Sequence, residues 1–468
     1  MSRLLPLLLT ATLLLAACAP ATPRPDQLSF APLEFHVPEV ERIDLPSGIR
    51  LYLKEDHELP LVSISAMIGG GTIGDPADKT GATDLFASLL RTGGAGSMSP
   101  EELDARLEFL AAELSVAADT YAVSAGMSLR SADLREGVAI LADVLRRPRF
   151  DEGRLELARK QAIEGIRRRD DDPGSVASRA LMQALYGEHP LGRVATVESI
   201  TAVARQDLVE HHRSYFHPSN LWLGITGDFD RGQLLELLQS AFGDWPRGQA
   251  PTVALPPLVE PAPPAVWVAE KSIPQTTIMF GEIGVDKDNP DLQAVRVMNY
   301  ILGGGGFNSR LMSEVRSDRG LAYSVYSYYQ VGRRLPGPFI AGCETKSEST
   351  LEVVKLMRRI MTELREQPVS EQELQLAKES LINSFVFAFE DSHDVITQKM
   401  RLDYYAYPED YLQTYREKVA AVSVEDVLRV ARRYLNPERQ ALVLVGDRAA
   451  FDGDPGALGT VRRVEAGQ

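Results

Sequence analysis

The sequence predicts an α+β fold made of two homologous halves, each a mostly antiparallel sheet covered by helices. The first observation is an internal repeat, in which three segments recur at one offset of 219 residues: 155–159 with 374–378, 215–218 with 434–437, and 227–228 with 446–447. The second is the order of patterns, because strand-like runs come before helical periodicity in each copy. Three matches in one register favour duplication of a unit of about 200 residues over chance.

A proline-rich stretch separates the copies and predicts a stiff linker at residues 246–265. It leaves an N-terminal domain at 35–245, a C-terminal domain at 266–455 and a short tail at 456–468. The 468 residues are enough for two domains with full cores.

The first copy opens on two strand-like runs at 49–53 and 61–67, which we expect to pair as a hairpin. Glycines end the second run, and a helix is expected from about Thr80 to Leu90. Ser99-Pro100-Glu101-Glu102 is a capping box with proline at the first helical position, so another helix begins there. The remaining expected elements are a strand region at 116–129, helices at 132–146, 151–169, 174–186 and 205–215, and a strand at 221–226.

The second copy repeats this order with a strand at 276–281 and a helix at 291–302. Four consecutive glycines follow, and they allow the backbone to approach another group closely. Beyond them we expect a short helix over 309–319 and an aromatic strand over 321–329. Arg316 near the end of this helix and Tyr323 near the start of this strand are then expected to lie close together, beside the flexible glycine backbone.

Composition and charge exclude several functions. The chain is 44% apolar and 25% charged, as is usual for globular proteins, and its net charge of −15 argues against general nucleic-acid binding. No Gly-x-Ser-x-Gly motif of serine hydrolases is present, and no Gly-Lys-Ser/Thr follows the glycines. The seven histidines include only one adjacent pair, His211 and His212, which point about 100° apart on a helix and cannot share an ion.

The N-terminus has the pattern of a targeting segment. Residues 4–17 form an apolar run of signal-peptide length, and Leu15-Ala16-Ala17-Cys18 resembles the lipobox of bacterial lipoproteins. We expect a signal peptide at 1–17, lipidation of Cys18 and a tether at 18–34. These place the protein in the periplasm, lipid-anchored to the outer membrane of a Gram-negative bacterium. A plain secretory signal is the alternative.

The chain after this segment resembles the pitrilysin/insulinase family of zinc peptidases, the inverzincins. That family has two such halves in a clamshell arrangement, with His-x-x-Glu-His on the first helix, where the histidines hold zinc and the glutamate activates water. Here Asp84, Ala87 and Ser88 occupy those positions, and the last ligand position falls at Gly165 beside Glu164. The resemblance implies a degenerate zinc motif and no cofactor in this chain.

The second copy resembles the same family from its glycine loop through Arg319 to Val325. The resemblance implies that Arg316 and Tyr323 contact a substrate carbonyl beside the metal. A guanidinium and a phenol can both donate to that oxygen, and such bonds strengthen as it becomes an oxyanion. Backbone groups of the loop would stay open to an extended peptide. The implied substrate-binding residues are Gly303, Gly304, Gly305, Gly306, Phe307, Ser309 and Arg310.

Some members of this family work as pairs, in which one subunit carries zinc and the other carries the Arg/Tyr motif. We therefore expect a zinc-less subunit of a periplasmic heteromeric metallopeptidase, inactive alone, that holds unfolded or short peptides for a zinc-bearing paralogue. Membrane contact would be through the lipid anchor alone, and no nucleic acid would bind. Two alternatives remain: a non-enzymatic peptide-binding or scaffold lipoprotein, and a peptidase with an unrecognised metal set that includes Asp84 and Glu164.

Overall fold

The computed structural model describes residues 37–253, 255–258 and 264–464. The predicted signal peptide, Cys18 and the tether lie outside the described residues. Within the described ranges, no helix is long and apolar enough to cross a membrane.

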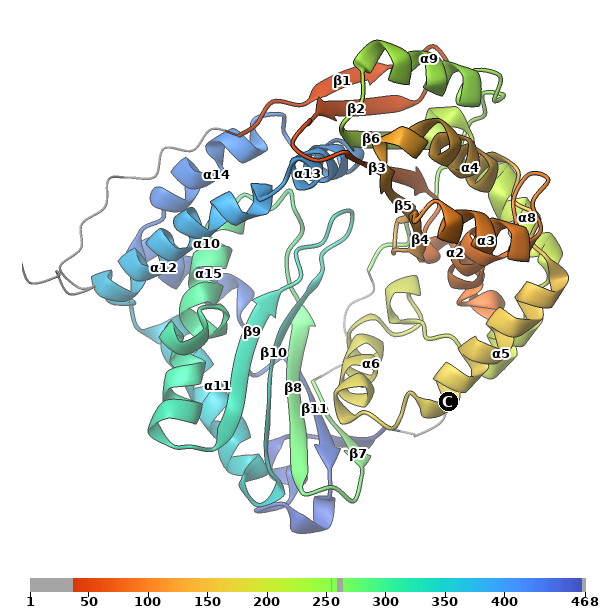
Figure 1. Cartoon of the computed structure of the whole chain (residues 1–468). Helices are drawn as coiled ribbons and strands as arrows, with labels where there is room; N and C mark the ends of the chain where they lie inside the picture. The colour runs from red at the N-terminus through yellow and green to blue at the C-terminus, as the bar shows by residue number, and fades with distance from the viewer. Residues whose placement is uncertain (1–36, 254, 259–263, 465–468) are drawn as a thin grey trace, which may run out of the picture. The chain divides into compact units, whose positions relative to one another are not determined.

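Two six-stranded sheets with helices confirm the predicted α+β class (Figure 1). The first sheet has the order β1 (Glu41–Asp44), β2 (Arg50–Glu55), β6 (Leu221–Gly227), β3 (Leu61–Gly69), β5 (Ala122–Arg130) and β4 (Glu113–Ala118). The second has the order β12 (Val461–Arg463), β7 (Val266–Glu270), β11 (Ala441–Gly446), β8 (Gln275–Ile283), β10 (Pro338–Lys346) and β9 (Ala322–Tyr329). Most neighbours are antiparallel, while β2 runs parallel to β6 and β7 runs parallel to β11 and β12.

The internal repeat is confirmed by the boundaries of the elements. Helix α8 (Arg205–Tyr215) and helix α15 (Val424–Tyr434) correspond residue for residue at the offset of 219.

The predicted capping box begins α3 (Pro100–Phe109), where the side chains of Ser99 and Glu102 each accept a hydrogen bond from the backbone N–H of the other. The other helices are α2 (Ala82–Thr92), α4 (Leu134–Arg146), α5 (Glu152–Arg168), α7 (Val197–Ala202), α9 (Arg231–Phe242), α10 (Leu292–Asn299), α11 (Thr350–Glu366), α12 (Glu371–Ser384) and α14 (Tyr411–Ala420).

One strand prediction is wrong, and another is confirmed with a turn inside it. The runs at 49–53 and 61–67 do not form a hairpin, because β6 lies between β2 and β3 and pairs with both. The expected strand region at 116–129 is itself a hairpin of β4 and β5, turned where the Asp119 N–H donates to the carbonyl of Ala122 at 2.7 Å. A strand that arrives from far along the chain leaves no local pattern at the place where it inserts.

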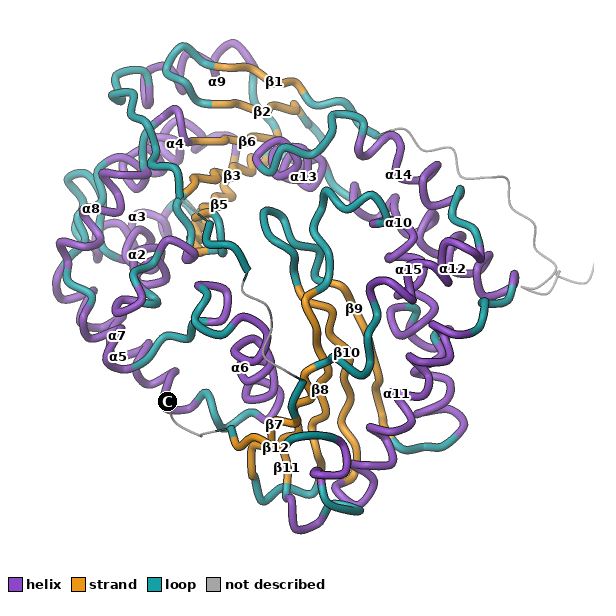
Figure 2. The backbone as a smooth tube through the Cα atoms, turned by 180° about the vertical axis from the view of Figure 1, so that it is seen from behind, coloured by secondary structure: helices purple, strands orange, loops and turns teal. Residues whose placement is uncertain are grey.

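Each sheet carries a helix from the other half. Helix α6 (Pro173–Tyr186) belongs to the first copy in sequence, yet its fully buried Leu181 packs on β8, where Gly281 leaves room for it. Helix α13 (Ser392–Tyr404) does the reverse, and its buried Ile396 packs with Tyr52 of the first sheet. Figures 1 and 2 show α6 beside the second sheet and α13 beside the first. The two helices start 219 residues apart, so the exchange is part of the repeat.

Polar contacts hold α13 on the first half at several points. The His393 ring nitrogens lie 2.8 Å from the Ser65 hydroxyl and 2.9 Å from the Thr226 hydroxyl. Near the other end of the helix, the Tyr52 hydroxyl donates to the Asp403 carboxylate at 2.8 Å. These bonds satisfy polar groups that the exchanged helix would otherwise bury without partners.

The histidine pair predicted to be unable to chelate is packed into the first core. The centre of the His211 ring lies 4.4 Å from that of Phe86 and 4.8 Å from that of Tyr215. Burial lowers the pKa of His211 to about 4. His211 therefore stays neutral in the folded state at pH values where the same side chain, with a pKa near 6.5, is protonated in the unfolded chain. Stability from this group is fully present above pH 6.5 and is lost as the pH falls toward 4.

We expect the His211→Phe variant to lose less stability on acidification than the wild type. Between pH 7.5 and pH 5.0 the difference in the change of unfolding free energy should be about 2 kcal/mol. Urea denaturation at both pH values measures it, with circular dichroism at pH 7.5 to verify the fold of the variant. Equal changes in the two proteins would contradict the neutral burial of His211.

Candidate functional site

The predicted helix over 309–319 is confirmed in place, but much of it is wound more loosely than an α-helix. After α10 the chain forms a π-helical turn at Tyr300–Gly304 and a 3₁₀ turn at Gly306–Asn308. A second π-helical segment, Met312–Asp318, leads into β9. Such π turns are rare and are frequently found at functional sites.

Three of the four glycines are needed for close packing. A Cβ atom on Gly303 would lie 2.5 Å from the backbone nitrogen of Ser327, so glycine allows the turn to lie directly on β9. Asn299 secures the same contact, because its amide donates to the Ser327 carbonyl at 3.1 Å and accepts from the Ser327 hydroxyl at 2.9 Å. Gly304 and Gly305 are crowded by Asn299 and Tyr300. Gly306 alone faces open space, with a φ of 55°.

Two predicted substrate-binding side chains are engaged inside the fold. The Ser309 hydroxyl donates to the carbonyl of Gly306 at 2.7 Å, and the residue is almost fully buried. Arg310 forms a two-pronged ion pair with Glu373 at 2.7 and 3.1 Å. Although burial raises the pKa of Glu373, the bonds from Arg310 and Ser370 lower it to about 2. Ser309 thus closes the turn on itself, and Arg310 ties the turn to α12.

The guanidinium of Arg316 contacts two exposed aromatic rings. Its guanidinium carbon lies 4.6 Å from the centre of the Phe307 ring and 4.5 Å from that of Tyr323. Phe307 is 67% exposed and Tyr323 is 83% exposed. Among the described residues, no hydrogen bond or ion pair reaches the guanidinium of Arg316. We call these three side chains the arginine stack.

Tyr323 is directed outward by an irregularity at the edge of the sheet. Strand β9 is the last strand of its sheet, and its register with β10 shifts between Cys343 and Thr345. Bulges of this kind re-aim a side chain and discourage pairing of an exposed edge. Tyr323 therefore leaves the core face, on which Val325 and Ser327 stay buried.

The first-half positions do not form a metal centre. Asp84 lies on α2 with Ala87 buried behind it, and surrounding atoms raise the pKa of the Asp84 carboxyl by desolvation although the residue is open to solvent. Glu164 pairs with Arg168 at 2.6 Å on α5, and a Cβ on Gly165 would face empty space. No group of three His, Cys, Asp or Glu residues that could hold a metal occurs in the described part of the chain. The residues present do not fit zinc, with Ser88 in place of the second imidazole.

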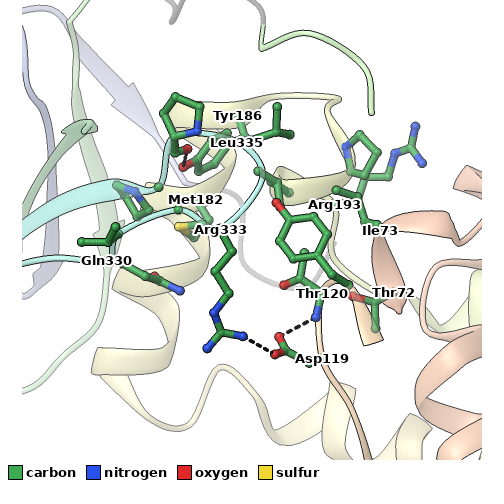
Figure 3. Close-up of a pocket in the computed structure, with 18 residues that line it drawn as sticks. Thr72, Ile73, Asp119, Thr120, Met182, Tyr186, Arg193, Gln330, Arg333 and Leu335 are labelled. Carbon is green, nitrogen blue, oxygen red and sulfur yellow. Dashed lines mark hydrogen bonds and ion pairs between the residues drawn. The ribbon is translucent and has the colours of Figure 1, made fainter. Parts of the chain in front are cut away.

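A separate cavity lies where the β9–β10 loop meets the first half (Figure 3). Its volume is about 330 Å³, and loop 330–338, α6 and the β4–β5 turn line it. Arg333 of the loop pairs with Asp119 at 3.0 Å, and the Tyr186 hydroxyl donates to the carbonyl of Pro336 at 3.2 Å. No local pattern in the sequence marks this cavity, because its walls come from four separate stretches of the chain, within residues 72–73, 119–121, 182–193 and 330–338.

Two sequence models of one peptidase family match the chain. The model described as Insulinase (Peptidase family M16) matches residues 50–196, and the model described as Peptidase M16 inactive domain matches residues 202–381. The chain belongs to the M16 (insulinase) peptidase family.

Relatives of the chain have names of two kinds. An uncharacterized zinc protease of Mycobacterium leprae is 26% identical over 420 residues, which are 86% of this chain and 91% of that protein. The non-peptidase homologue YmxG of Helicobacter pylori is 28% identical over 381 residues, which are 80% of this chain and 86% of that protein. Similarity to the family therefore does not by itself separate active from inactive members.

Solved structures share the fold. A peptidase M16 inactive domain from Pseudomonas fluorescens has a TM-score of 0.80 and 28% identity, covering 88% of this chain and 99% of that chain. A protease from Helicobacter pylori has a TM-score of 0.78 at 18% identity, covering 88% of this chain and 100% of that chain.

Proposed function

We propose that this protein is the zinc-less, substrate-binding subunit of a heteromeric M16 peptidase. The observation that carries the proposal is the contrast between the two halves. Asp84, Ala87 and Ser88 replace the zinc motif, whereas Arg316 and Tyr323 are both present, with Arg316 half-buried and Tyr323 exposed. A chain that had lost all catalytic use would have no need to keep two surface donors beside a tightly packed turn.

The position of the arginine stack favours action on another chain. The C-terminal end of β9 leads into the loop whose Arg333 contacts Asp119 of the first half. Tyr323 lies at the other end of β9, and six residues of strand separate it from Tyr329 by about 20 Å. The stack therefore lies away from that contact between the halves, where a partner subunit can reach it.

The chemical role proposed for the stack is donation to a peptide carbonyl. The guanidinium of Arg316 and the hydroxyl of Tyr323 both donate, and both bonds strengthen as the carbonyl oxygen gains negative charge. The partner's zinc would supply the activated water. We further propose that the subunit is anchored through Cys18 in the periplasm, at the outer membrane.

A second candidate function is non-enzymatic peptide binding. The name of the Helicobacter pylori relative, a non-peptidase homologue, supports it. In that function Arg316 and Tyr323 would hold peptide without cleavage by a partner. Peptide binding that is unchanged by Tyr323→Phe, with no peptidase in the complex, would favour this candidate.

The purified protein alone should hold well below one zinc ion per chain and should not cleave unfolded peptides. Metal analysis and a peptide-cleavage assay measure this. Purification from the native host should also yield a zinc-motif M16 paralogue, and the resulting complex should be active. Stoichiometric zinc together with cleavage by the isolated chain would refute the proposal.

A further inference from the structure

The arginine stack leaves more donors free than one carbonyl oxygen can use. Both the Phe307 ring and the Tyr323 ring contact the Arg316 guanidinium through their π faces, which accept no conventional hydrogen bond from it. A guanidinium carries five N–H donors in its plane. A carbonyl oxygen accepts one or two of them. The remaining donors form a planar fork, the shape that matches a carboxylate.

No acid of the described chain neutralises this cation. The nearby Glu314 pairs with Arg359 at 2.5 Å. Asp318, two residues beyond Arg316, lies on a different side of the helical segment, because residues two apart do not face each other. Arg310 forms an ion pair with Glu373, whereas no acidic side chain of the described residues pairs with Arg316.

Phe307 has little reason to occupy its place except the contact with Arg316. Phe307 is 67% exposed and belongs to a 3₁₀ turn that begins at Gly306, where φ is 55°. Contact with another side chain removes part of such a ring from water, which is favourable. Here it covers a cation and limits the rotation of a long side chain, so that less entropy is lost when the guanidinium binds.

We propose that the arginine stack selects peptides that place a carboxylate beside the bound carbonyl, and that Phe307 is the residue that positions Arg316 for this task. The carboxylate is either the C-terminus of the peptide or an acidic side chain. The proposal rests on the proposed function, because it specifies the substrate class of the same site. It adds a preference for anionic peptides that donation to a neutral carbonyl does not require.

Three versions of one fluorescent peptide test the preference by fluorescence anisotropy with the full-length protein. The first has a free C-terminus and no acidic side chain, the second is the same peptide amidated, and the third is amidated with one internal glutamate. We expect the first or the third to bind about tenfold more tightly than the second, as for one charge-assisted two-pronged bond. Which of the two binds more tightly identifies the source of the carboxylate.

Variants of Arg316 and Phe307 show whether these side chains act on the carboxylate or only support the fold. Arg316→Lys keeps the charge but removes the planar fork, and it should abolish most of the preference for the carboxylate. Phe307→Ala should reduce the preference several-fold, and Phe307→Tyr should restore it. Arg319→Ala removes an exposed arginine three residues away and should change nothing.

Equal affinity for acid and amide, in binding that still depends on Arg316, would overturn the inference and leave the proposed function standing. A preference that Phe307→Ala leaves intact would refute the positioning role. Cleavage by the complex with the zinc-bearing paralogue that is indifferent to Arg316→Ala would overturn the proposed function itself. Each outcome is distinct, so the two proposals fail separately.

Discussion

Replacing Arg316 with alanine is expected to lower kcat/KM of the complex with a zinc-bearing paralogue about 100-fold, the scale of one lost oxyanion donor. The loss should fall mainly on kcat, because the donor bond strengthens as the substrate oxygen becomes charged. Stability should change little, since within the described residues Arg316 makes stacking contacts with exposed rings only. Steady-state kinetics and thermal unfolding of the same preparations measure both quantities.

Arg319→Ala is the matched control for this experiment. Arg319 is exposed, and its partner Glu352 lies 4.0 Å away, so the pair contributes little to stability. Activity of the Arg316→Ala complex within twofold of the wild type would show that the stack does not contact the reacting carbonyl. Loss of assembly would be detected as dissociation in size-exclusion chromatography, and would be repaired by excess variant subunit.

Replacing Leu181 with alanine is expected to destabilise the protein by about 2–5 kcal/mol, the range for a buried leucine that leaves a cavity. Leu181 is fully buried against β8, and a Cβ on Gly281 would already lie 2.8 Å from its side chain. The loss arises because α6 joins the two halves, so the cavity opens between elements that are far apart in sequence. Urea denaturation measures the free energy of unfolding.

Leu157→Ala is the control for the exchanged helix. Leu157 is 47% exposed on α5, so its truncation should change the free energy of unfolding by no more than about 0.5 kcal/mol. Equal costs for the two leucines would mean that α6 does not pack on the second sheet in solution. Ile396→Ala on α13 should resemble Leu181→Ala, because the exchange is repeated there.

Local sequence patterns were enough to predict most of the helices and strands. The capping box at Ser99 marks the start of α3 because its two reciprocal bonds involve residues only three apart. The offset of 219 residues predicts the matching helices α8 and α15, since duplicated sequence folds into duplicated structure. Pairing of strands was harder, and β6 could not be placed between β2 and β3 from any short segment.

The candidate site, like the fold, could be predicted only in part from the sequence. The order of amino acids places Asp84, Ala87 and Ser88 where the family resemblance leads us to expect the metal motif, and places Arg316 and Tyr323 after the glycines. These expectations need only residue type and spacing, because Ala87 and Ser88 lack the imidazole and carboxylate groups that the motif supplies.

Tertiary structure decided which residues of the glycine segment face outward. Arg310 is matched by Glu373, which lies 63 residues away, and Gly303 is required by the backbone of Ser327 on the next strand. The stack of Phe307 on Arg316 likewise depends on two turns that bring the ring over the guanidinium. Partners of this kind are set by packing between segments, and packing is a property of the folded chain that no local spacing encodes.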